Sequence, residues 1–421
     1  MTLGCWKNVV DSENLLGQLG VNNATLVDEL DEAETVVINT CGFIDAAKKE
    51  SIDTIMEAVE RKANGRLKKV VVMGCLSERF GQELALEIPE VDAFYGSNDV
   101  QRVLKSLELD YKHELVGERL LLTPSHFAYL KISEGCDHPC SFCAIPLMRG
   151  KHRSRPHEEV LREATSLAQR GVKELILIAQ DSTYYGLDLY GERRLRRLLE
   201  ELCTVDGVEW IRLMYAYPAK FPQDILNVFK NNPKLCRYMD IPVQHASDEV
   251  LKSMRRGMTN RATRELLTTI KREIPDIALR TTLIVGYPGE TEQDFQTLCE
   301  FVREMGFHRL GVFTYSQEEG TTAEPLGDPI TQKVKEQRRA TIMEIQKEIS
   351  HKRNTKLVGS EVTVIIDRHE NDVAVGRTQW DAPEIDQEVF VQAGRSLAVG
   401  NFYRVKIVDA VEYDLFAQPV S

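Results

Sequence analysis

The segment Glu134-Gly-Cys-Asp-His-Pro-Cys-Ser-Phe-Cys143 carries three cysteines at a C-x3-C-x2-C spacing, directly after a predicted strand at Phe127–Ser133. These cysteines are Cys136, Cys140 and Cys143. Three closely spaced thiolates suit an iron–sulfur cluster, because clusters in proteins are held mainly by cysteine thiolates. Zinc would normally take a fourth Cys or His ligand, and His138 lies within the same loop. The segment therefore predicts an iron–sulfur site, with a zinc knuckle as the alternative.

Short apolar runs alternate with helical patterns from His126 onward. The predicted strands are Phe127–Ser133, Glu174–Ala179, Trp210–Tyr215, Tyr238–Ile241, Leu279–Val285 and Leu310–Tyr315. Consecutive strand–helix units of this kind predict an open (β/α)6 version of the parallel barrel, with its active site in the loops that follow the strands. A long charged helix at Ile330–Asn354, with apolar residues at helical spacing, is predicted to lead out of the barrel.

The chain before the barrel alternates between two predicted strands, Thr35–Asn39 and Lys69–Met73, and two predicted helices, Ile44–Arg61 and Ser77–Glu87. This α/β alternation indicates a doubly wound parallel sheet. After Gly359, short alternating runs without helical period predict a small all-β barrel, with strands at Glu361–Ile366, Glu388–Gln392 and Tyr403–Ile407. The sequence thus predicts three domains, over residues 1–115, 122–354 and 355–421.

Bulk composition agrees with an ordered multidomain chain. Its 421 residues exceed the size at which one hydrophobic core stops growing, and 43% of them are hydrophobic. No apolar run approaches the roughly 20 residues that a membrane span needs, so we expect a cytoplasmic protein without a membrane partner. In that reducing compartment, some of the nine cysteines should be metal ligands. The net charge of −12 argues weakly against nucleic acid as a partner of the whole surface.

Three further cysteines, Cys5, Cys41 and Cys75, each end a β-like run. Because the carboxyl ends of parallel strands face one edge of a sheet, these thiolates can converge in the crevice where ligands bind. We therefore predict a second three-cysteine cluster in the N-terminal domain, with three unrelated buried thiols as the alternative. The remaining cysteines have no partner motif and are interpreted as packing or surface residues; they are Cys203, Cys236 and Cys299.

The cysteine loop and the strand–helix units after it resemble the radical S-adenosylmethionine superfamily, and nearly the whole chain resembles its methylthiotransferase family. The resemblance is carried by Leu3-Gly-Cys-Trp-Lys-Asn8, Asn39-Thr-Cys-Gly-Phe43, Gly74-Cys-Leu76, Ser133-Glu-Gly-Cys136, Met148-Arg-Gly150, Ser154-Arg-Pro156 and Gly286-Tyr-Pro-Gly-Glu-Thr291. One departure is Trp6, where proline is commoner in the family. The resemblance implies two 4Fe–4S clusters, one on each three-cysteine set, with S-adenosylmethionine as radical source and methyl donor.

The same resemblance implies how the two sets divide the work. The catalytic set, Cys136, Cys140 and Cys143, would leave one iron open to S-adenosylmethionine, and the cluster on the N-terminal set would supply sulfur. The adenosyl radical would take hydrogen from the target carbon, after an electron arrives from a reduced ferredoxin or flavodoxin type of donor. A redox or cluster-carrier protein is the alternative from another class, and it is disfavoured because carriers usually saturate their irons with protein thiolates.

Some members of this family methylthiolate adenosine in tRNA, and one methylthiolates the β-carbon of an aspartate in small-subunit ribosomal protein twelve. The sequence resembles the protein-modifying member more closely at Asp240-Ile-Pro-Val-Gln-His-Ala-Ser-Asp248, Ser253-Met-Arg-Arg256, Gly311-Val-Phe-Thr-Tyr-Ser-Gln-Glu-Glu-Gly320 and Tyr413-Asp-Leu-Phe-Ala417. The last module resembles the TRAM domain, which binds RNA in tRNA-modifying relatives. Residues 360–421 hold five Lys or Arg against eleven Asp or Glu, a net charge of −6, whereas an RNA-binding surface is expected to be basic. The charge favours a basic ribosomal protein over tRNA, with a solvated acidic face as the plain alternative.

Five residues outside the cysteine sets lie at or near predicted strand ends and are candidates for binding S-adenosylmethionine. They are Gln180, Arg212, Gln244, Gly286 and Pro288. The run Gly286-Tyr-Pro-Gly289 would let the backbone approach the cofactor, because glycine leaves room that a side chain would fill. Each candidate has an equally good structural interpretation. The basic run Arg149–Arg155 after the cysteine loop is a candidate substrate-facing segment, with solvated loop charge as the alternative.

Overall fold

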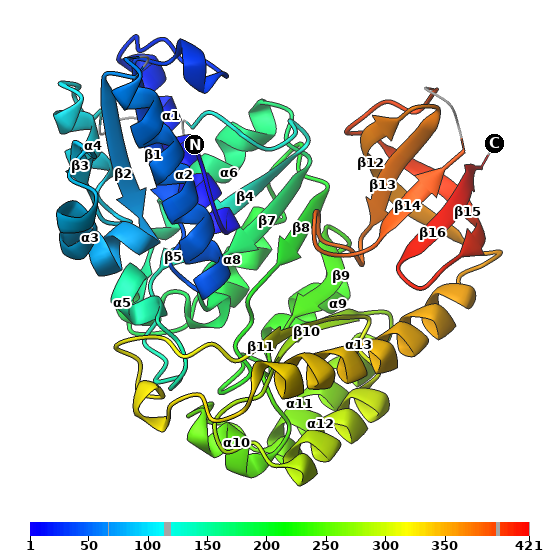
Figure 1. The fold of residues 1–421 in the computed structure, drawn as a ribbon. Coiled ribbons are helices and arrows are strands. Elements are labelled where there is room, and N and C mark those ends of the chain that lie inside the picture. The colour runs from blue at the N-terminus through cyan, green and yellow to red at the C-terminus, as the bar shows by residue number, and fades with distance from the viewer. Residues whose placement is uncertain (66, 113–118, 393–395, 421) are drawn as a thin grey trace.

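The computed structural model describes residues 1–65, 67–112, 119–392 and 396–420. Three parts follow one another along the chain: an N-terminal α/β unit, a central open barrel and a C-terminal closed barrel (Figure 1). The predicted α/β multidomain class with a final all-β barrel is confirmed. The predicted end of the first domain at residue 115 lies outside the described residues.

The N-terminal unit is a parallel sheet in the order β1 (Thr35–Thr40), β2 (Lys69–Gly74) and β3 (Ala93–Phe94). Its helices are α1 (Trp6–Val21), α2 (Asp45–Ala63), α3 (Cys75–Glu87) and α4 (Val100–Ser106). Side chains alternate along β2, so that Val70 and Val72 pack with α2 and α3 while Val71 and Met73 pack with α1 and α4. This arrangement confirms the predicted doubly wound sheet.

Two cysteines of this unit lie at helix starts. The expected strand before Cys5 is reduced to a single parallel bridge between Thr2 and Asn39, and Cys5 caps the N-terminus of α1. Cys75 is the first residue of α3, directly after Gly74 with a φ of 106°. A residue with a side chain would be strained at that φ, and this turn sends the chain from β2 into α3.

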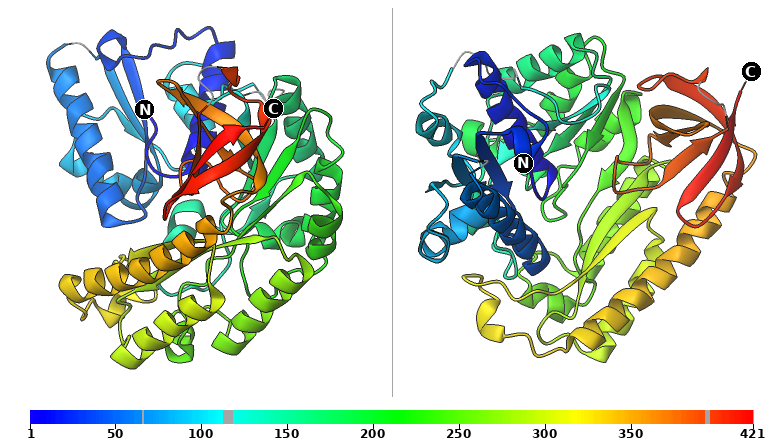
Figure 2. Two further views of the ribbon diagram at one scale, coloured as in Figure 1. Left: turned by 90° about the vertical axis from the view of Figure 1, so that its right-hand side faces the viewer. Right: turned by 45° about the horizontal axis from the view of Figure 1, so that its top comes forward.

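The central barrel is a six-stranded parallel sheet in the order β11-β10-β9-β8-β7-β4. Its strands are β4 (Phe127–Lys131), β7 (Glu174–Ile178), β8 (Trp210–Leu213), β9 (Leu235–Asp240), β10 (Ala278–Val285) and β11 (Arg309–Thr314). The helices after them are α6 (His157–Gln169), α8 (Leu195–Leu202), α9 (Ile225–Asn231), α11 (Asn260–Glu273), α12 (Glu292–Met305) and α13 (Gln332–Thr355). The sheet curves without closing, as Figure 2 shows, and each of the six predicted strands is confirmed within a few residues.

Short elements connect the main ones. They are β5 (Ser133–Glu134), α5 (Ile145–Arg149), β6 (Arg153–Ser154), α7 (Leu187–Tyr190), α10 (Asp248–Ser253) and the 3-10 turns Leu30–Glu32, Ser182–Tyr184 and Glu324–Leu326. The largest core lies between the outer face of the barrel sheet and its helices. A second cluster fills the inner face, where Tyr129 and Tyr238 meet Val10 of α1 and Ile365 of the C-terminal barrel. The N-terminal unit and the C-terminal barrel therefore both pack against the inner face of the open barrel.

The C-terminal barrel closes in the order β12-β13-β14-β16-β15. Its strands are β12 (Glu361–Glu370), β13 (Val373–Thr378), β14 (Glu388–Val391), β15 (Phe402–Ala410) and β16 (Asp414–Pro419). The sequence did not predict β13 and β16. Helix α13 runs from the central barrel to this module, as expected for the predicted charged helix (Figure 1). Among the described residues, no helix is long and apolar enough to cross a membrane.

Candidate active site

The barrel cysteines lie in the loop after β4 and β5, at the carboxyl end of the parallel sheet where barrels of this kind build their active sites. The amide of Cys136 donates to the carbonyl oxygen of Gly150 at 3.1 Å. Ser141, between the other two cysteines, donates its amide to the Met254 carbonyl at 3.0 Å. Its hydroxyl lies 2.9 Å from the hydroxyl of Tyr287. The loop is thus anchored to its own end, to α10 and to the turn after β10.

The three barrel thiols suit a metal cluster better than free thiol chemistry. Burial, reinforced by the neighbouring Cys140, raises the pKa of Cys136 and of Cys143 to about 12. A bound metal removes the proton of such a thiol outright, which offsets the cost of burying the thiolate. Nη1 of Arg256 lies 3.3 Å from Sγ of Cys140, where it can balance the negative charge of the thiolates. The donor set therefore fits an iron–sulfur cluster.

His138, the residue on which the zinc alternative depends, is engaged elsewhere. Its Nε2 lies 2.7 Å from Oδ2 of Asp181, and its ring stacks on Tyr217 with centroids 3.5 Å apart. A histidine paired and stacked in this way is not placed as a fourth ligand beside the three thiols. The histidine and Tyr217 instead form one wall beside the cysteine loop, since the Tyr217 hydroxyl lies 3.6 Å from Sγ of Cys140.

The structure brings the other three predicted cysteines together. A Cβ added to Gly4 would stand 2.8 Å from Sγ of Cys41, and one added to Gly42 would stand 3.1 Å from the Cys75 carbonyl carbon. Glycine at these two positions thus lets the three cysteine segments approach one another. Burial raises the pKa of Cys75 to about 12, and the nearby Cys5 and Cys41 add to that rise.

Neither set is arranged as a single-ion site. Among the described residues, no group of three or more His, Cys, Asp or Glu side chains is placed to hold one metal ion. A four-iron cube differs, because each thiolate binds a separate iron and the thiolates need not meet at one point. A cube held by three cysteines alone would have one iron without a protein thiolate, which is the arrangement predicted for both sets.

The two cysteine sets are neighbours in space. Cys75 packs with Ala144 and Met148, which belong to the segment immediately after the barrel cysteine loop. The hydroxyl of Ser97, from the N-terminal unit, donates to the Met148 carbonyl at 2.7 Å. Helix α5 therefore lies between the barrel set and Cys75.

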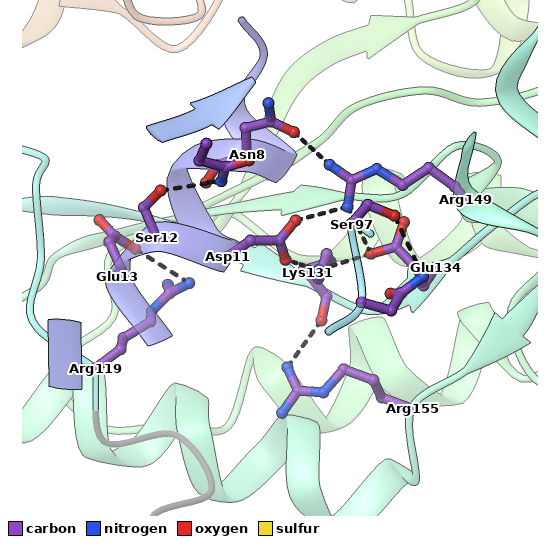
Figure 3. A network of polar contacts seen from close by, with 12 residues as sticks. Asn8, Asp11, Ser12, Glu13, Ser97, Arg119, Lys131, Glu134, Arg149 and Arg155 are labelled. Atoms are coloured by element: carbon purple, nitrogen blue, oxygen red, sulfur yellow. Dashed lines mark hydrogen bonds and ion pairs between the residues drawn. The ribbon is translucent and has the colours of Figure 1, made fainter. Parts of the chain in front are cut away.

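Arg149, at the end of α5, connects the two sets through buried charge (Figure 3). Its side chain is 1% exposed, and Nη1 lies 2.6 Å from Asp11 of α1 and 3.2 Å from Glu134 of β5. Its other terminal nitrogen contacts Oδ1 of Asn8, and that oxygen lies 3.8 Å from Sγ of Cys75. In the sequence, Arg149 belongs to the basic run Arg149–Arg155 and to the motif Met148-Arg-Gly150, and neither pattern indicates its buried partners.

Lys131 completes this network by contacting both Asp11 and Glu134, so that two cations face two carboxylates. Burial would raise the pKa of Glu134, but Lys131 and Arg149 outweigh it and lower that pKa to about 2. A second balanced group consists of Glu13, Arg119, Arg155 and Glu163. Its members Glu13, Arg119 and Arg155 are labelled in Figure 3. Both groups join α1 to the barrel.

Two predicted cofactor-binding residues, Gln180 and Gln244, offer buried amide oxygens without a hydrogen-bond partner among the described residues. Nε2 of Gln180 donates to Glu134 at 2.8 Å, which places Gln180 beside the cysteine loop. Gln244 follows β9 with a φ of 73°, a conformation that is uncommon for a residue with a side chain. Unpaired buried acceptors are costly, and a bound cation or amine would satisfy them.

The predicted pair Gly286 and Pro288 lies in a buried turn after β10. Gly286 has a φ of 77°, and a Cβ there would overlap the side-chain stem of Lys335 from α13. Oε2 of Glu290 accepts from the amide of Gly286 at 2.5 Å and from that of Tyr287 at 3.2 Å. This turn reaches the cysteine loop through the contact of Tyr287 with Ser141.

Arg212 lies elsewhere. Its buried side chain donates to Glu174 at 2.8 Å and to the carbonyl oxygen of Gln379 in the C-terminal barrel at 2.8 Å. Glu174 also pairs with Arg377, and Arg377 pairs with Asp367 at 3.0 Å. The structure therefore gives Arg212 a place in the contact between the two barrels, and its role in binding S-adenosylmethionine stays a prediction.

Several acidic side chains of the C-terminal barrel form ion pairs inside the molecule. Asp381 pairs with Arg309 and Asp386 lies 3.6 Å from Arg280, and the side chains of both acids are at most 2% exposed. With Asp367, three of the eleven acids predicted to favour a basic partner hold the module on the central barrel. The buried Asp381 and Asp386 are therefore not exposed to a basic substrate protein.

Comparison with known proteins matches three family models, in the order of the three parts. Residues 1–96 match an uncharacterized protein family, UPF0004, residues 130–302 match the radical SAM superfamily, and residues 358–420 match the TRAM domain. A ribosomal protein uS12 methylthiotransferase RimO of Christiangramia forsetii is 55% identical over 422 residues, covering 100% of this chain and 94% of the relative. The chain belongs to the RimO family. RimO of Cytophaga hutchinsonii is 54% identical, covering 100% and 97%.

Membership of the RimO family confirms the predicted enzyme class, a radical S-adenosylmethionine methylthiotransferase, and the tRNA-modifying alternative is not favoured. Among solved structures, the radical S-adenosylmethionine methyltransferase TsrM of Kitasatospora setae, in a complex with tryptophan and a cofactor analogue, is similar with a TM-score of 0.55. That match has 14% identity and covers 72% of this chain and 70% of the other, so it supports the fold alone.

Proposed function

We propose that this protein methylthiolates the β-carbon of an aspartate in ribosomal protein uS12. The observation that carries the proposal is the pair of three-cysteine sets packed on either side of α5, in a chain of the RimO family. Cys136, Cys140 and Cys143 would hold one 4Fe–4S cluster, and Cys5, Cys41 and Cys75 would hold the second. When bound, these clusters and S-adenosylmethionine supply the electron, the carbon radical, the sulfur and the methyl group.

The chain's own residues would bind and orient these groups. The amide oxygens of Gln180 and Gln244 suit the amino group of S-adenosylmethionine, because each is buried and still lacks a donor among the described residues. Gly286 and Pro288 would let the backbone approach the cofactor beside the cysteine loop. Arg256 balances the charge of the barrel thiolates. The electron would come from a reduced ferredoxin or flavodoxin type of donor.

Acids that stay exposed on the C-terminal barrel are available to a basic ribosomal protein. Asp372 at the turn between β12 and β13 is exposed, and so is Glu370, which also pairs with Arg368. Charge of this kind speeds the encounter of two proteins more than it tightens the final complex.

The proposal is tested by mass spectrometry of uS12 and of tRNA from cells that lack this protein. We expect uS12 to lose its methylthio group and to regain it when the unaltered protein or the Cys203→Ala variant is supplied. The Cys136→Ala variant should not restore it. Loss of a tRNA methylthio group, with uS12 unchanged, would contradict the proposal.

A further inference from the structure

The segment Ser316–Ala323, between β11 and the 3-10 turn Glu324–Leu326, touches both halves of the candidate site. At its end, the amide of Ala323 donates to the carbonyl oxygen of Ser141 at 2.8 Å. The hydroxyl of Thr322 lies 3.4 Å from the same oxygen. Because Ser141 stands between Cys140 and Cys143, this end of the segment is bonded directly to the barrel cysteine loop.

The other end of the segment binds the N-terminal unit through Glu318. Its Oε2 lies 2.9 Å from Nη1 of Arg79 on α3 and 2.7 Å from Nζ of Lys48 on α2. The side chains of Glu318 and Arg79 are each 4% exposed. Nη1 of Arg79 also donates to the carbonyl oxygen of Gly42 at 3.0 Å, and Gly42 directly follows Cys41. Glu318 is thus linked through Arg79 to Gly42, the residue next to Cys41.

Hydrogen bonds within the segment leave it little freedom. The amide and hydroxyl of Thr321 donate to the Glu318 carbonyl oxygen at 3.3 and 2.7 Å. The amide of Gly320 donates to Glu324 at 2.7 Å, and the hydroxyl of Ser316 donates to Oε1 of Glu318 at 3.0 Å. A shift of Glu318 would therefore be transmitted to Ala323 and to the cysteine loop.

We infer that Ser316–Ala323 sets the position of the N-terminal cysteine set relative to the barrel set, with Glu318 as the positioning residue. The inference rests on the proposed function, since it takes both sets to serve one reaction. Burying a carboxylate between two cations does little for net stability, because desolvation offsets much of the attraction. It does specify geometry, and reactions between held groups are sensitive to displacements of about 1 Å. Glu318 acts here through Arg79 and touches no reacting atom.

The test compares Glu318→Gln with Glu319→Gln in the full chain. Glu319 is an exposed neighbour that reaches Arg79 only through its backbone oxygen, so its variant makes the same charge change without loss of that contact. A third variant, Arg79→Lys, keeps a cation opposite Glu318. It loses the guanidinium group that also donates to the carbonyl oxygens of Gly42 and Glu319. For each we would measure iron content, 5′-deoxyadenosine, methylthiolated uS12, and hydrogen exchange of α2 and α3 in metal-free protein.

Glu318→Gln is expected to keep its iron and its cleavage of S-adenosylmethionine, while methylthiolated uS12 per 5′-deoxyadenosine falls about tenfold. Exchange in α2 and α3 should rise, and the magnetic interaction between the reduced clusters should weaken in electron paramagnetic resonance spectra. Arg79→Lys should change the same readouts less, and Glu319→Gln should match the unaltered protein.

An unchanged product ratio in Glu318→Gln, or unchanged exchange in α2 and α3, would overturn the inference. Failure of the proposed function looks different, because the unaltered protein itself would then leave uS12 unmodified. Hydrogen exchange needs neither substrate nor cluster, so unchanged exchange in Glu318→Gln would still overturn the inference in that case.

Discussion

Buried charge between α1 and the barrel is balanced residue by residue. Asp11 and Glu134 face Lys131 and Arg149, and each side chain is at most 13% exposed. Pairs of this kind add little net stability when complete, but removal of one partner leaves a buried charge that nothing compensates. Loss of Arg149 would therefore destabilise the molecule mainly by leaving buried carboxylate charge on Asp11 and Glu134 without a second cation.

We predict that Arg149→Met destabilises the protein by about 3–5 kcal/mol, because Asp11 and Glu134 would share the single cation Lys131. Chemical denaturation of the metal-free protein would measure this. The exposed Lys151 in the same basic run is a matched control, and Lys151→Met should change stability by less than about 0.5 kcal/mol. Equal effects of the two variants would show that the network does not join α1 to the barrel.

The cysteine motifs can be recognised from spacing along the chain, whereas contacts between residues far apart in sequence cannot. The C-x3-C-x2-C run and the three strand-end cysteines are visible along the chain. The partners of Arg149 and Arg212 are not, because Asp11 stands 138 residues before Arg149 and Gln379 stands 167 residues after Arg212. The sequence therefore predicts a cofactor role for Arg212 without indicating its contact with the C-terminal barrel.

At the scale of single elements, buried polar residues obscure the usual periodicity. Helix α1 was missed because its inward face carries Asn8, Asp11, Ser12 and Glu13 in place of an apolar stripe. Strand β13 was missed for a related reason, since the buried Arg377 follows the buried Gly376 and breaks the alternation of apolar residues. Barrel strands such as β7, which is buried along its whole length, were predicted because they hold uninterrupted apolar runs, in β7 the four residues after Glu174.

The turn after β10 tests how closely α13 packs on the proposed cofactor site. Gly286→Ala should destabilise the protein by about 2–4 kcal/mol and weaken S-adenosylmethionine binding, because both the positive φ and the Lys335 stem oppose a side chain. Gly289→Ala is the matched control, since its φ of 89° is also positive but nothing lies within 4 Å. It should cost about 1–2 kcal/mol from strain alone. Thermal unfolding would measure the stability of both variants, and equilibrium dialysis would measure their binding of S-adenosylmethionine. Equal losses of stability in the two variants would show that the Lys335 stem does not oppose a side chain at Gly286.

At the scale of the whole molecule, the central barrel receives both neighbours on its inner side. Trp6 of the N-terminal unit stacks on Tyr129 with centroids 5.0 Å apart, and its Nε1 donates to Glu384 of the C-terminal barrel at 3.1 Å. His126 lies 2.7 Å from Asp367, close to the pairs formed by Arg377. The C-terminal barrel is thus attached to the other two parts through polar and charged contacts of Glu384 and Asp367.

This attachment should depend on pH. Burial alone would raise the pKa of Asp367, but Arg377 and His126 outweigh it and hold that pKa below its usual value. The stability that Asp367 contributes is therefore present above about pH 4 and is lost as pH falls through the lower folded-state pKa. Calorimetry should show that Asp367→Asn melts earlier at neutral pH and loses less on acidification than the unaltered protein. Asp372→Asn, on the exposed turn, should behave as the unaltered protein at both pH values.

The account depends on two three-cysteine sets with separate tasks, and the variant Cys5→Ala/Cys41→Ala/Cys75→Ala tests this most directly. Anaerobically reconstituted enzyme with S-adenosylmethionine, reductant and uS12 would be assayed for iron, 5′-deoxyadenosine and methylthiolated uS12. The unaltered protein should hold about eight irons and form both products. The variant should hold about half the iron, continue to form 5′-deoxyadenosine and form no methylthiolated uS12. Formation of methylthiolated uS12 by the variant would contradict separate tasks for the two sets. So would a variant that forms neither 5′-deoxyadenosine nor methylthiolated uS12.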